Sequence, residues 1–224
     1  MDKVLKIGII GCGAIGRDHC RRIIDSVPGA TVVAVSDYVA AAADATAATY
    51  GIRSYGNDCD GMIRDPEVEA VVITSIDATH HDYVMKVLAE EKWCFCEKPL
   101  SQNAKDCEEI IARELEIGKR LVQVGFMRRY DKSYAYAKQQ IEAGAIGTPY
   151  MVKATGIDPE SAVEGAIRFS GTSGGIFLDM AIHDIDLMRW FLGSEVTEVY
   201  AMGATFKHPE FKAAGDDETG VAVF

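Results

Sequence analysis

The stretch that decides the fold is IGIIGCGAIGRDH, residues 7–19, where a glycine-rich loop separates an apolar run from a helical pattern. The run at residues 4–10 is rich in Val and Ile and predicts a buried strand. After the loop, side chains at every fourth position predict one face of a helix: Ile15, His19, Ile23 and Val27. Pro28 and Gly29 then end that helix. A strand, a glycine turn and a helix in this order begin a parallel α/β sheet.

Three glycines of the loop, Gly11, Gly13 and Gly16, form the pattern GxGxxG, which is weak evidence alone in a chain with 21 glycines. Its position strengthens it, because the first glycine permits a tight turn and the second lets a pyrophosphate approach the backbone. The third allows close packing of helix and strand. Ala14 and Ile15 open the helix, whose N-terminus attracts anions. We therefore predict that this loop binds a dinucleotide; the alternative is a tight turn without a ligand.

An acidic residue, Asp37, ends the next β-branched run, 21 residues after Gly16. A carboxylate at this place accepts hydrogen bonds from a ribose 2′-hydroxyl and repels a 2′-phosphate. Tyr38 beside it brings no positive charge that would reverse this preference. The sequence therefore predicts NAD, in preference to NADP, as the cofactor.

Strand-like and helical segments alternate through residues 1–124 and predict a doubly wound parallel sheet, a Rossmann domain. Further strands are expected at residues 31–36, 68–75, 93–96 and 120–124, and further helices at 39–50, 79–91 and 104–117. Thr79 and Asp82 have the spacing of a capping box. For His80 and its neighbour we favour capping and packing over metal ligation. Because Ser75 and His80 follow the carboxyl end of a strand, they are also predicted to line the cofactor crevice.

The stretch CFCEKPL, which begins at Cys94, ends another predicted strand. Cys94 and Cys96 point to the same face of that strand, and we predict buried thiols there in preference to a metal pair. Glu97 and Lys98 follow at the carboxyl end, where open parallel sheets bind ligands. Pro99 restricts the backbone of Lys98. Glu97 and Lys98 are therefore predicted to bind the cofactor.

Composition narrows the class of protein. The chain has 224 residues, room for up to two ordinary domains, and a net charge of −11, which argues against nucleic acid or an anionic membrane as a partner. No apolar run approaches the roughly 20 residues that span a bilayer. Six cysteines, none in a CxxC pair and with no export signal before them, predict reduced thiols and a cytoplasmic location.

The alternation ends near residue 124, and a second, α+β domain is predicted over residues 125–224. Helices are expected at residues 133–143 and 176–192, and strands at 147–155, 196–202 and 219–224. The last strand has no neighbour after it in the sequence. We therefore expect this domain to be partial and the chain to be a C-terminally truncated fragment.

The apolar helix expected at residues 176–192 carries a charged face. Asp179 and His183 are four residues apart, with Asp186 one turn further on. A carboxylate orients an imidazole and stabilises its protonated form, as a proton acceptor requires. Two alternatives stay open: a salt-bridged helix surface, and a metal site, although no further His or Cys lies near enough in sequence to complete one. We predict no metal.

Taken together, GCGAIG, Asp37, EKP at Glu97 and D-x-x-x-H-x-x-D from Asp179 resemble the Gfo/Idh/MocA oxidoreductase family. Within it, FCEKPL and GKRLVQVGFMRRYD, residues 118–131, are similar to inositol 2-dehydrogenases. The resemblance implies a Rossmann domain followed by a domain with an open, mainly antiparallel sheet. That sheet usually carries subunit contacts, so a homo-oligomer, dimer or tetramer, is implied.

The resemblance also implies a reaction: NAD-dependent oxidation of a cyclic polyol hydroxyl to a ketone, with myo-inositol to 2-keto-myo-inositol as the leading candidate. Lys98 would lie beside the nicotinamide and the substrate hydroxyl, His183 would be the acid/base, and Asp179 would bind or orient. Asp158 would bind substrate, although Ile157 stands where many relatives carry Arg. The alternatives are another sugar or inositol dehydrogenase, a non-catalytic NAD-sensing regulator, and an inactive truncated form.

Overall fold

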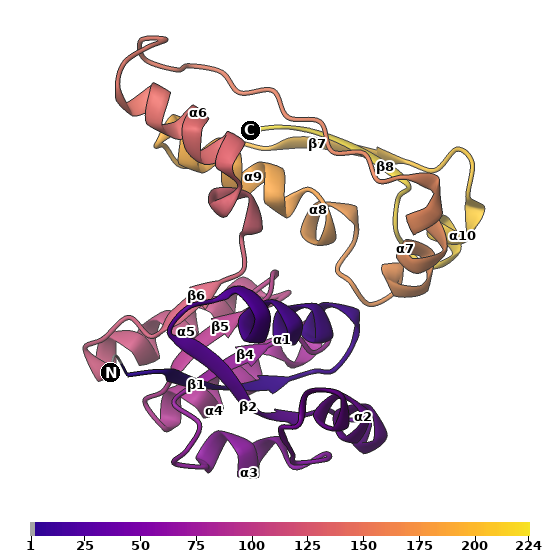
Figure 1. Ribbon diagram of the computed structural model, residues 1–224. Coiled ribbons are helices and arrows are strands. Elements are labelled where there is room, and N and C mark those ends of the chain that lie inside the picture. Colours follow the sequence, from indigo (N-terminus) through magenta and orange to yellow (C-terminus); the bar gives the residue numbers. More distant parts are fainter. Residues whose placement is uncertain (1–2) are drawn as a thin grey trace. The chain divides into compact units, whose positions relative to one another are not determined.

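The computed structural model describes residues 3–224 and divides the chain into two compact units, one ending at Gly125 and one spanning Phe126–Phe224 (Figure 1). The first unit holds a six-stranded sheet and the second a two-stranded sheet. Within residues 3–224, no helix has the length and apolar composition needed to cross a membrane.

The first unit is a parallel sheet with the strand order β3-β2-β1-β4-β5-β6. Its strands are β1 (Leu5–Ile10), β2 (Ala30–Ser36), β3 (Arg53–Ser54), β4 (Ala70–Ile73), β5 (Trp93–Cys96) and β6 (Val122–Val124). Its helices are α1 (Ala14–Ser26), α2 (Ala40–Tyr50), α3 (Cys59–Arg64), α4 (His80–Ala89) and α5 (Ala104–Ile117), with a 3₁₀ turn η1 (Asp77–Thr79). The chain winds outward from β1 in both directions, so the predicted doubly wound Rossmann fold is confirmed.

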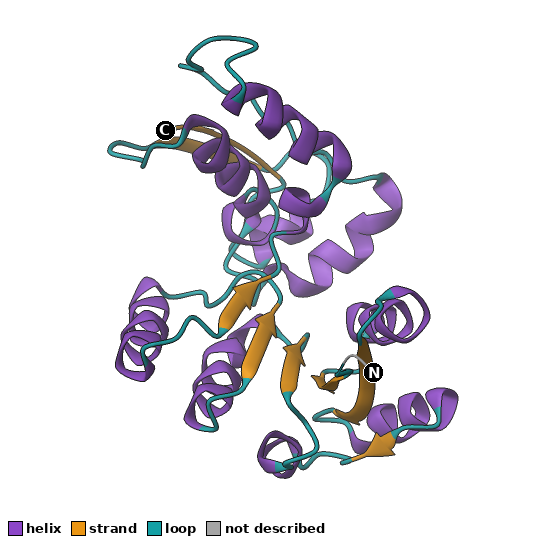
Figure 2. Ribbon diagram, turned by 60° about the vertical axis from the view of Figure 1, so that its left-hand side comes forward, coloured by secondary structure: helices purple, strands orange, loops and turns teal. Residues whose placement is uncertain are grey.

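Helices cover both faces of this sheet (Figure 2), and alternate strand residues supply two separate cores. In β4, Ala70 and Val72 pack in the core with α1 and α2, whereas Val71 and Ile73 pack in the core with α3, α4 and α5. All four side chains are buried, which explains why the strand is an unbroken apolar run.

The buried face of α1 differs from the prediction. Gly16, Cys20 and Ile23 are buried, whereas Ile15 is 56% and Val27 45% exposed. The reason lies at Gly16, where a Cβ atom would stand 1.8 Å from a carbonyl oxygen of the glycine loop. Only a glycine fits at this contact, so the helix must turn the face of Gly16 toward the loop. This rotation points Ile15 outward.

The predicted capping box at Thr79 is wrong. The Thr79 hydroxyl donates to the Ile76 carbonyl oxygen at 2.7 Å and lies 2.8 Å from the Ser75 hydroxyl, and no side chain caps α4. Thr79 therefore stabilises η1, the turn between β4 and α4, which sequence spacing did not reveal.

Cys94 and Cys96 are buried on the same face of β5, in the core with α3, α4 and α5, while Phe95 packs on the opposite side. Burial raises the pKa of the Cys94 thiol to about 12, and that of Cys96 higher still. Both thiols are therefore protonated at neutral pH and pack as small apolar groups, as predicted.

The second unit combines helices with a two-stranded antiparallel sheet, β7 with β8. Its elements are η2 (Met127–Tyr130), α6 (Lys132–Glu142), η3 (Glu160–Ala162), α7 (Val163–Ser170), α8 (Ile176–Asp179), α9 (Ile182–Leu192), β7 (Tyr200–Ala204), α10 (Pro209–Ala213) and β8 (Thr219–Val223). α8 lies against the sheet, because a Cβ at Gly220 would meet the Phe177 ring at 2.7 Å. The predicted α+β class is confirmed.

The strand predicted at residues 147–155 is wrong. This segment has no regular secondary structure, and within residues 3–224 no strand pairs with it. Tyr150 is 90% exposed, and Pro149 lacks a backbone N–H for a ladder. Its β-branched and aromatic residues have a strand propensity that only a neighbouring strand could satisfy.

Candidate active site

The predicted cofactor residues of the first unit gather at one edge of its sheet. β2, β1, β4 and β5 are consecutive neighbours and parallel, so their carboxyl ends lie side by side. The glycine loop follows β1, Asp37 follows β2, Ser75 closely follows β4, and Glu97 and Lys98 follow β5. The strand order reverses between β1 and β4, with β2 on one side and β5 on the other. Open α/β sheets bind ligands at the carboxyl edge beside such a reversal.

The three glycines of the loop have different surroundings. Gly11 has a φ of +97°, and a Cβ there would stand 2.7 Å from the Thr74 carbonyl oxygen. Gly16 packs still more tightly against Gly11 itself. A Cβ at Gly13, in contrast, would have no atom within 4 Å apart from Gly13 itself and its two chain neighbours. Packing within the chain therefore explains Gly11 and Gly16, whereas the open space at Gly13 is compatible with the cradle that a pyrophosphate needs.

The groups around this cradle suit a dinucleotide. Gly13, Ala14 and Ile15 are exposed, and no side chain caps the 13-residue helix α1, so its first-turn N–H groups face the cradle. Asp37 is held beside the loop because its carboxylate oxygens accept hydrogen bonds from the N–H groups of Cys12, at 2.6 Å, and Val39, at 2.7 Å. A carboxylate has further lone pairs for ribose hydroxyls. The residues present therefore fit NAD.

Ser75 lies against the glycine loop, since its backbone nitrogen is 2.7 Å from where a Gly11 Cβ would stand. His80 does not line the crevice, contrary to the prediction. Its side chain is 1% exposed, with Nδ1 2.7 Å from the Pro99 carbonyl oxygen and Nε2 3.1 Å from that of Ser75. The buried ring therefore connects the backbone at Ser75 with the backbone at Pro99, which is consistent with the packing role favoured for it.

Glu97 and Lys98 directly follow β5, and sequence patterns missed one residue, His19, that contacts Glu97. The Glu97 N–H donates to the Ile73 carbonyl oxygen at 3.0 Å, which extends the pairing of β5 with β4. Its Oε1 lies 2.7 Å from His19 Nε2 of α1. Its Oε2 accepts the Lys98 N–H at 3.3 Å. His19 was assigned to the packing face of its helix; the available signal was its position three residues after Gly16.

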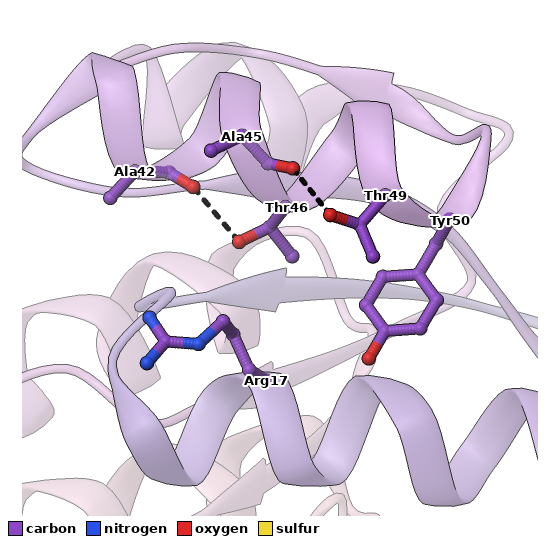
Figure 3. A pocket seen from close by; sticks show the side chains of 6 residues that line it. All are labelled: Arg17, Ala42, Ala45, Thr46, Thr49 and Tyr50. Atoms are coloured by element: carbon purple, nitrogen blue, oxygen red, sulfur yellow. Dashed lines mark hydrogen bonds between the residues drawn. The ribbon is translucent and has the colours of Figure 1, made fainter.

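A pocket of about 300 Å³ lies between α1 and α2 (Figure 3). It is lined by Arg17, Ala42, Ala45, Thr46, Thr49 and Tyr50. The hydroxyls of Thr46 and Thr49 donate to carbonyl oxygens of their own helix, and Arg17 donates to the Cys12 carbonyl oxygen at 2.7 Å. These polar groups serve the fold, and Arg17 ties α1 to the glycine loop.

In the second unit, Asp179 and His183 are half-buried but do not share one continuous helix, contrary to the prediction. α8 ends at Asp179, and the His183 N–H donates to the Met180 carbonyl oxygen at 3.4 Å. The Ala181 N–H reaches back five residues to Ile176, which widens the turn and starts α9 in a new register. The two side chains therefore lie on consecutive helices, one at an end and one at a start.

Asp186, the third member of the predicted charged face, has a structural partner. Its two oxygens accept hydrogen bonds from Arg129 Nε, at 2.8 Å, and Nη2, at 2.7 Å, and its side chain is 5% exposed. The guanidinium also stacks over Trp190, and its hydrogen bonds with Asp186 raise the pKa of Arg129. Arg128 pairs likewise with Asp184. These pairs anchor α9, the helix of His183, to η2.

Asp158, predicted to bind substrate, is exposed on the irregular segment before η3. Two residues earlier, this segment passes close to α9, because a Cβ at Gly156 would stand 3.0 Å from Asp184 Oδ2. Within residues 3–224, no group of three or more His, Cys, Asp or Glu side chains is arranged to hold a metal ion.

Known proteins share both units. Residues 5–126 match the oxidoreductase family with an NAD-binding Rossmann fold, Gfo/Idh/MocA, and residues 134–224 match the C-terminal domain of the same family. The chain belongs to the Gfo/Idh/MocA oxidoreductase family. The resemblance seen in its motifs is thereby confirmed, and NAD is the cofactor of its Rossmann domain.

Relatives within the Gfo/Idh/MocA family include an uncharacterised oxidoreductase, YrbE, of Bacillus subtilis, 39% identical over 99% of this chain and 63% of its own length. An inositol 2-dehydrogenase of Ralstonia nicotianae is 42% identical over 85% of this chain and 55% of its own length. The chain thus spans little more than half to under two thirds of the length of these relatives.

Two solved structures from Lactobacillus casei extend the comparison. Scyllo-inositol dehydrogenase with bound NAD(H) and scyllo-inositol is 35% identical, with a TM-score of 0.91 over 98% of this chain and 65% of that chain. Myo-inositol dehydrogenase in complex with NAD(H) and myo-inositol is 32% identical, with a TM-score of 0.84 over 98% of this chain and 63% of that chain.

The different surroundings of Gly13 and Gly16 predict that alanine at Gly13 weakens cofactor binding and that alanine at Gly16 lowers stability. Gly13→Ala should leave the melting temperature without cofactor unchanged but weaken NAD binding at least about tenfold, because its methyl group enters the cradle. Gly16→Ala should destabilise the fold by about 1–3 kcal/mol, since the backbone must move. Thermal melts and calorimetric NAD titrations test this; equal melting temperatures for the two variants would contradict it.

The Arg129–Asp186 pair predicts a stability difference between two arginines. Arg129→Ala leaves a buried carboxylate without its partner and should cost roughly 1–3 kcal/mol, less than a fully buried pair because Arg129 is partly exposed. Arg189→Ala removes an ion pair with the exposed Glu195 and should cost under about 1 kcal/mol. Urea denaturation measures the free energy of unfolding of both variants. An equal loss in both would refute the stabilising role of the Arg129–Asp186 pair.

Proposed function

We propose that this protein oxidises a hydroxyl of a cyclic polyol to a ketone with NAD, and that myo-inositol, giving 2-keto-myo-inositol, is its leading substrate. The observation that carries the proposal is the single edge that joins the open cradle at Gly13, the carboxylate of Asp37 and the half-buried Lys98. Family membership supports it, as do the two L. casei dehydrogenases, whose structures contain NAD(H) and an inositol.

In the proposed chemistry, NAD takes the hydride of the carbinol carbon when bound, and two side chains act on the hydroxyl oxygen. The protein's part is to take the hydroxyl proton. His183 is the proton acceptor, and Lys98 donates a hydrogen bond to the same oxygen and, as a cation, stabilises the negative charge that develops there. Asp179 holds the imidazole or a neighbouring hydroxyl. Asp158 contributes a further contact to the polyol.

The cofactor contacts follow from the same edge. The backbone of Gly11, Gly13, Ala14, Ile15 and Gly16 receives the pyrophosphate. Asp37 accepts the ribose hydroxyls and repels a 2′-phosphate, which favours NAD over NADP. Ser75 and Glu97 border the crevice, one beside the loop and one beside Lys98.

Self-association and location belong to the same proposal. One face of the β7/β8 sheet presents Tyr200, Met202, Val221 and Val223, in cross-strand pairs and all more than 60% exposed. An apolar sheet face of this kind favours a homo-oligomer through this surface. The six free cysteines support the proposal of a cytoplasmic location, because thiols are kept reduced there.

A second candidate is a dehydrogenase of another sugar or inositol isomer. Ile157, 84% exposed beside Asp158, favours it, since an apolar side chain there offers no hydrogen bond to a polyol. A non-catalytic NAD sensor is a weaker alternative, because such a protein needs the glycine loop but has no need of Lys98 and His183.

The deciding experiment follows the absorbance of NADH or NADPH with a panel of inositol isomers and cyclic sugars, each supplied with NAD or NADP. We expect turnover with NAD and an inositol, and slower turnover with NADP. Turnover only with a sugar would select the second candidate. NAD binding without turnover on any substrate would favour the sensor or an inactive form.

Replacing His183 tests the proton acceptor directly. His183→Ala should lower kcat on the order of 10²–10⁴-fold, as for other general bases, and leave the affinity for NAD near that of the unchanged protein. Steady-state kinetics and NAD titration measure the two effects. Unchanged turnover in the variant would rule out His183 as the proton acceptor.

A further inference from the structure

The carboxylate of Glu97 is held from two sides. His19, from the middle of α1, places Nε2 2.7 Å from Oε1, and the ring N–H donates because a carboxylate only accepts. The other oxygen accepts the backbone N–H of Lys98 at 3.3 Å. One carboxylate thus bridges α1 and the residue proposed to hold the substrate hydroxyl.

The backbone of Gly125 and the ring of Phe95 pack closely against this pair. A Cβ at the buried Gly125 would stand 2.9 Å from Glu97 Oε2 and 3.1 Å from the Phe95 ring. The Gly125 N–H donates to the Cys96 carbonyl oxygen at 2.7 Å, so this backbone is itself fixed. The edge of the His19 ring packs on Phe95, with centroids 5.3 Å apart. His19 and Glu97 are about one-quarter exposed, unlike a surface ion pair.

The pair also links the two halves of the cofactor edge. His19 lies three residues after Gly16, on the helix whose N-terminus faces the cradle. Glu97 is tied through its N–H to Ile73 at the end of β4. A shift of α1 therefore reaches Lys98 through a single hydrogen-bonded side chain.

We infer that His19 and Glu97 are a positioning pair, in which His19 orients the Glu97 carboxylate and this carboxylate fixes the backbone of Lys98 at the cofactor edge. The inference rests on the proposed function in one respect: Lys98 is taken to act on the substrate. Misplacement of a reacting group by about 1 Å can cost on the order of 10²-fold in rate. Loss of the pair should therefore lower kcat without a matching loss of NAD binding.

The test compares four single variants of the full chain. His19→Leu removes the donor, whereas His19→Gln keeps an N–H that reaches Glu97. Gly125→Ala keeps the His19 side chain and crowds the carboxylate together with the Phe95 ring. Arg22→Leu on α1 removes only an exposed ion pair with Asp18 and is the matched control. Each variant is measured for melting temperature, NAD affinity, kcat and hydrogen exchange at the Lys98 amide.

For His19→Leu and Gly125→Ala we expect exchange at the Lys98 amide to speed up about tenfold or more, and kcat to fall about 10–100-fold, with NAD affinity within about threefold. His19→Gln and Arg22→Leu should resemble the unchanged protein. In a Lys98→Met background, His19→Leu should have no further effect on residual turnover, because the pair acts through Lys98.

Two results would overturn the inference. One is unchanged exchange at Lys98 in His19→Leu. The other is His19→Gln as impaired as His19→Leu, which would assign the ring a packing role only. If the unchanged protein shows no turnover on any substrate, the proposed function fails, and the exchange measurements alone still decide whether the pair fixes Lys98.

Discussion

The first unit depends on one backbone contact, the approach of α1 to the glycine loop at Gly16. A single methyl group there would lie 1.8 Å from the Gly11 carbonyl oxygen, so helix and loop meet with no side chain between them. This contact sets the rotation of α1. It turns Cys20 and Ile23 into the core and Ile15 out of it, and it leaves the surface at Gly13 open.

The rotation has a chemical consequence further along the helix. With Gly16 against the loop, His19 reaches Glu97 at the end of β5. The same helix therefore carries the N-terminus proposed to face a pyrophosphate and, further along, a side chain that contacts the neighbour of Lys98. In the second unit, the hydrogen bonds from Arg129 to Asp186 hold α9, the helix of His183, against η2. In both units, partly or fully buried polar pairs orient the elements that carry the proposed catalytic groups.

Local patterns predicted much of the first unit. The strand at Trp93–Cys96 and the helix at Ala104–Ile117 have the predicted bounds. The helix ends as predicted because Gly118 adopts a left-handed conformation. The errors arose where a specific backbone or hydroxyl contact with a residue three to five positions away competes with the periodic pattern. The face of α1 yielded to the contact at Gly16, and the hydroxyl of Thr79 bonds within a turn instead of capping a helix. The apolar run from Ile176 was predicted as one helix but divides at Asp179, because a wide turn there begins a new register.

By itself, the sequence determined the class of the fold and the position of the glycine loop, and it predicted NAD as the cofactor. The roles of Lys98 and His183 stay proposals, supported by the resemblance of their motifs to the family. The fold class and the glycine loop depend on residue type and on spacing within short segments, which short-range geometry controls. Only the tertiary structure decided that Gly13 is the glycine without a packing role, that His80 is buried and that His19 holds Glu97. These depend on which backbone passes within 3–4 Å of which side chain, and the folding of distant segments against one another sets those distances.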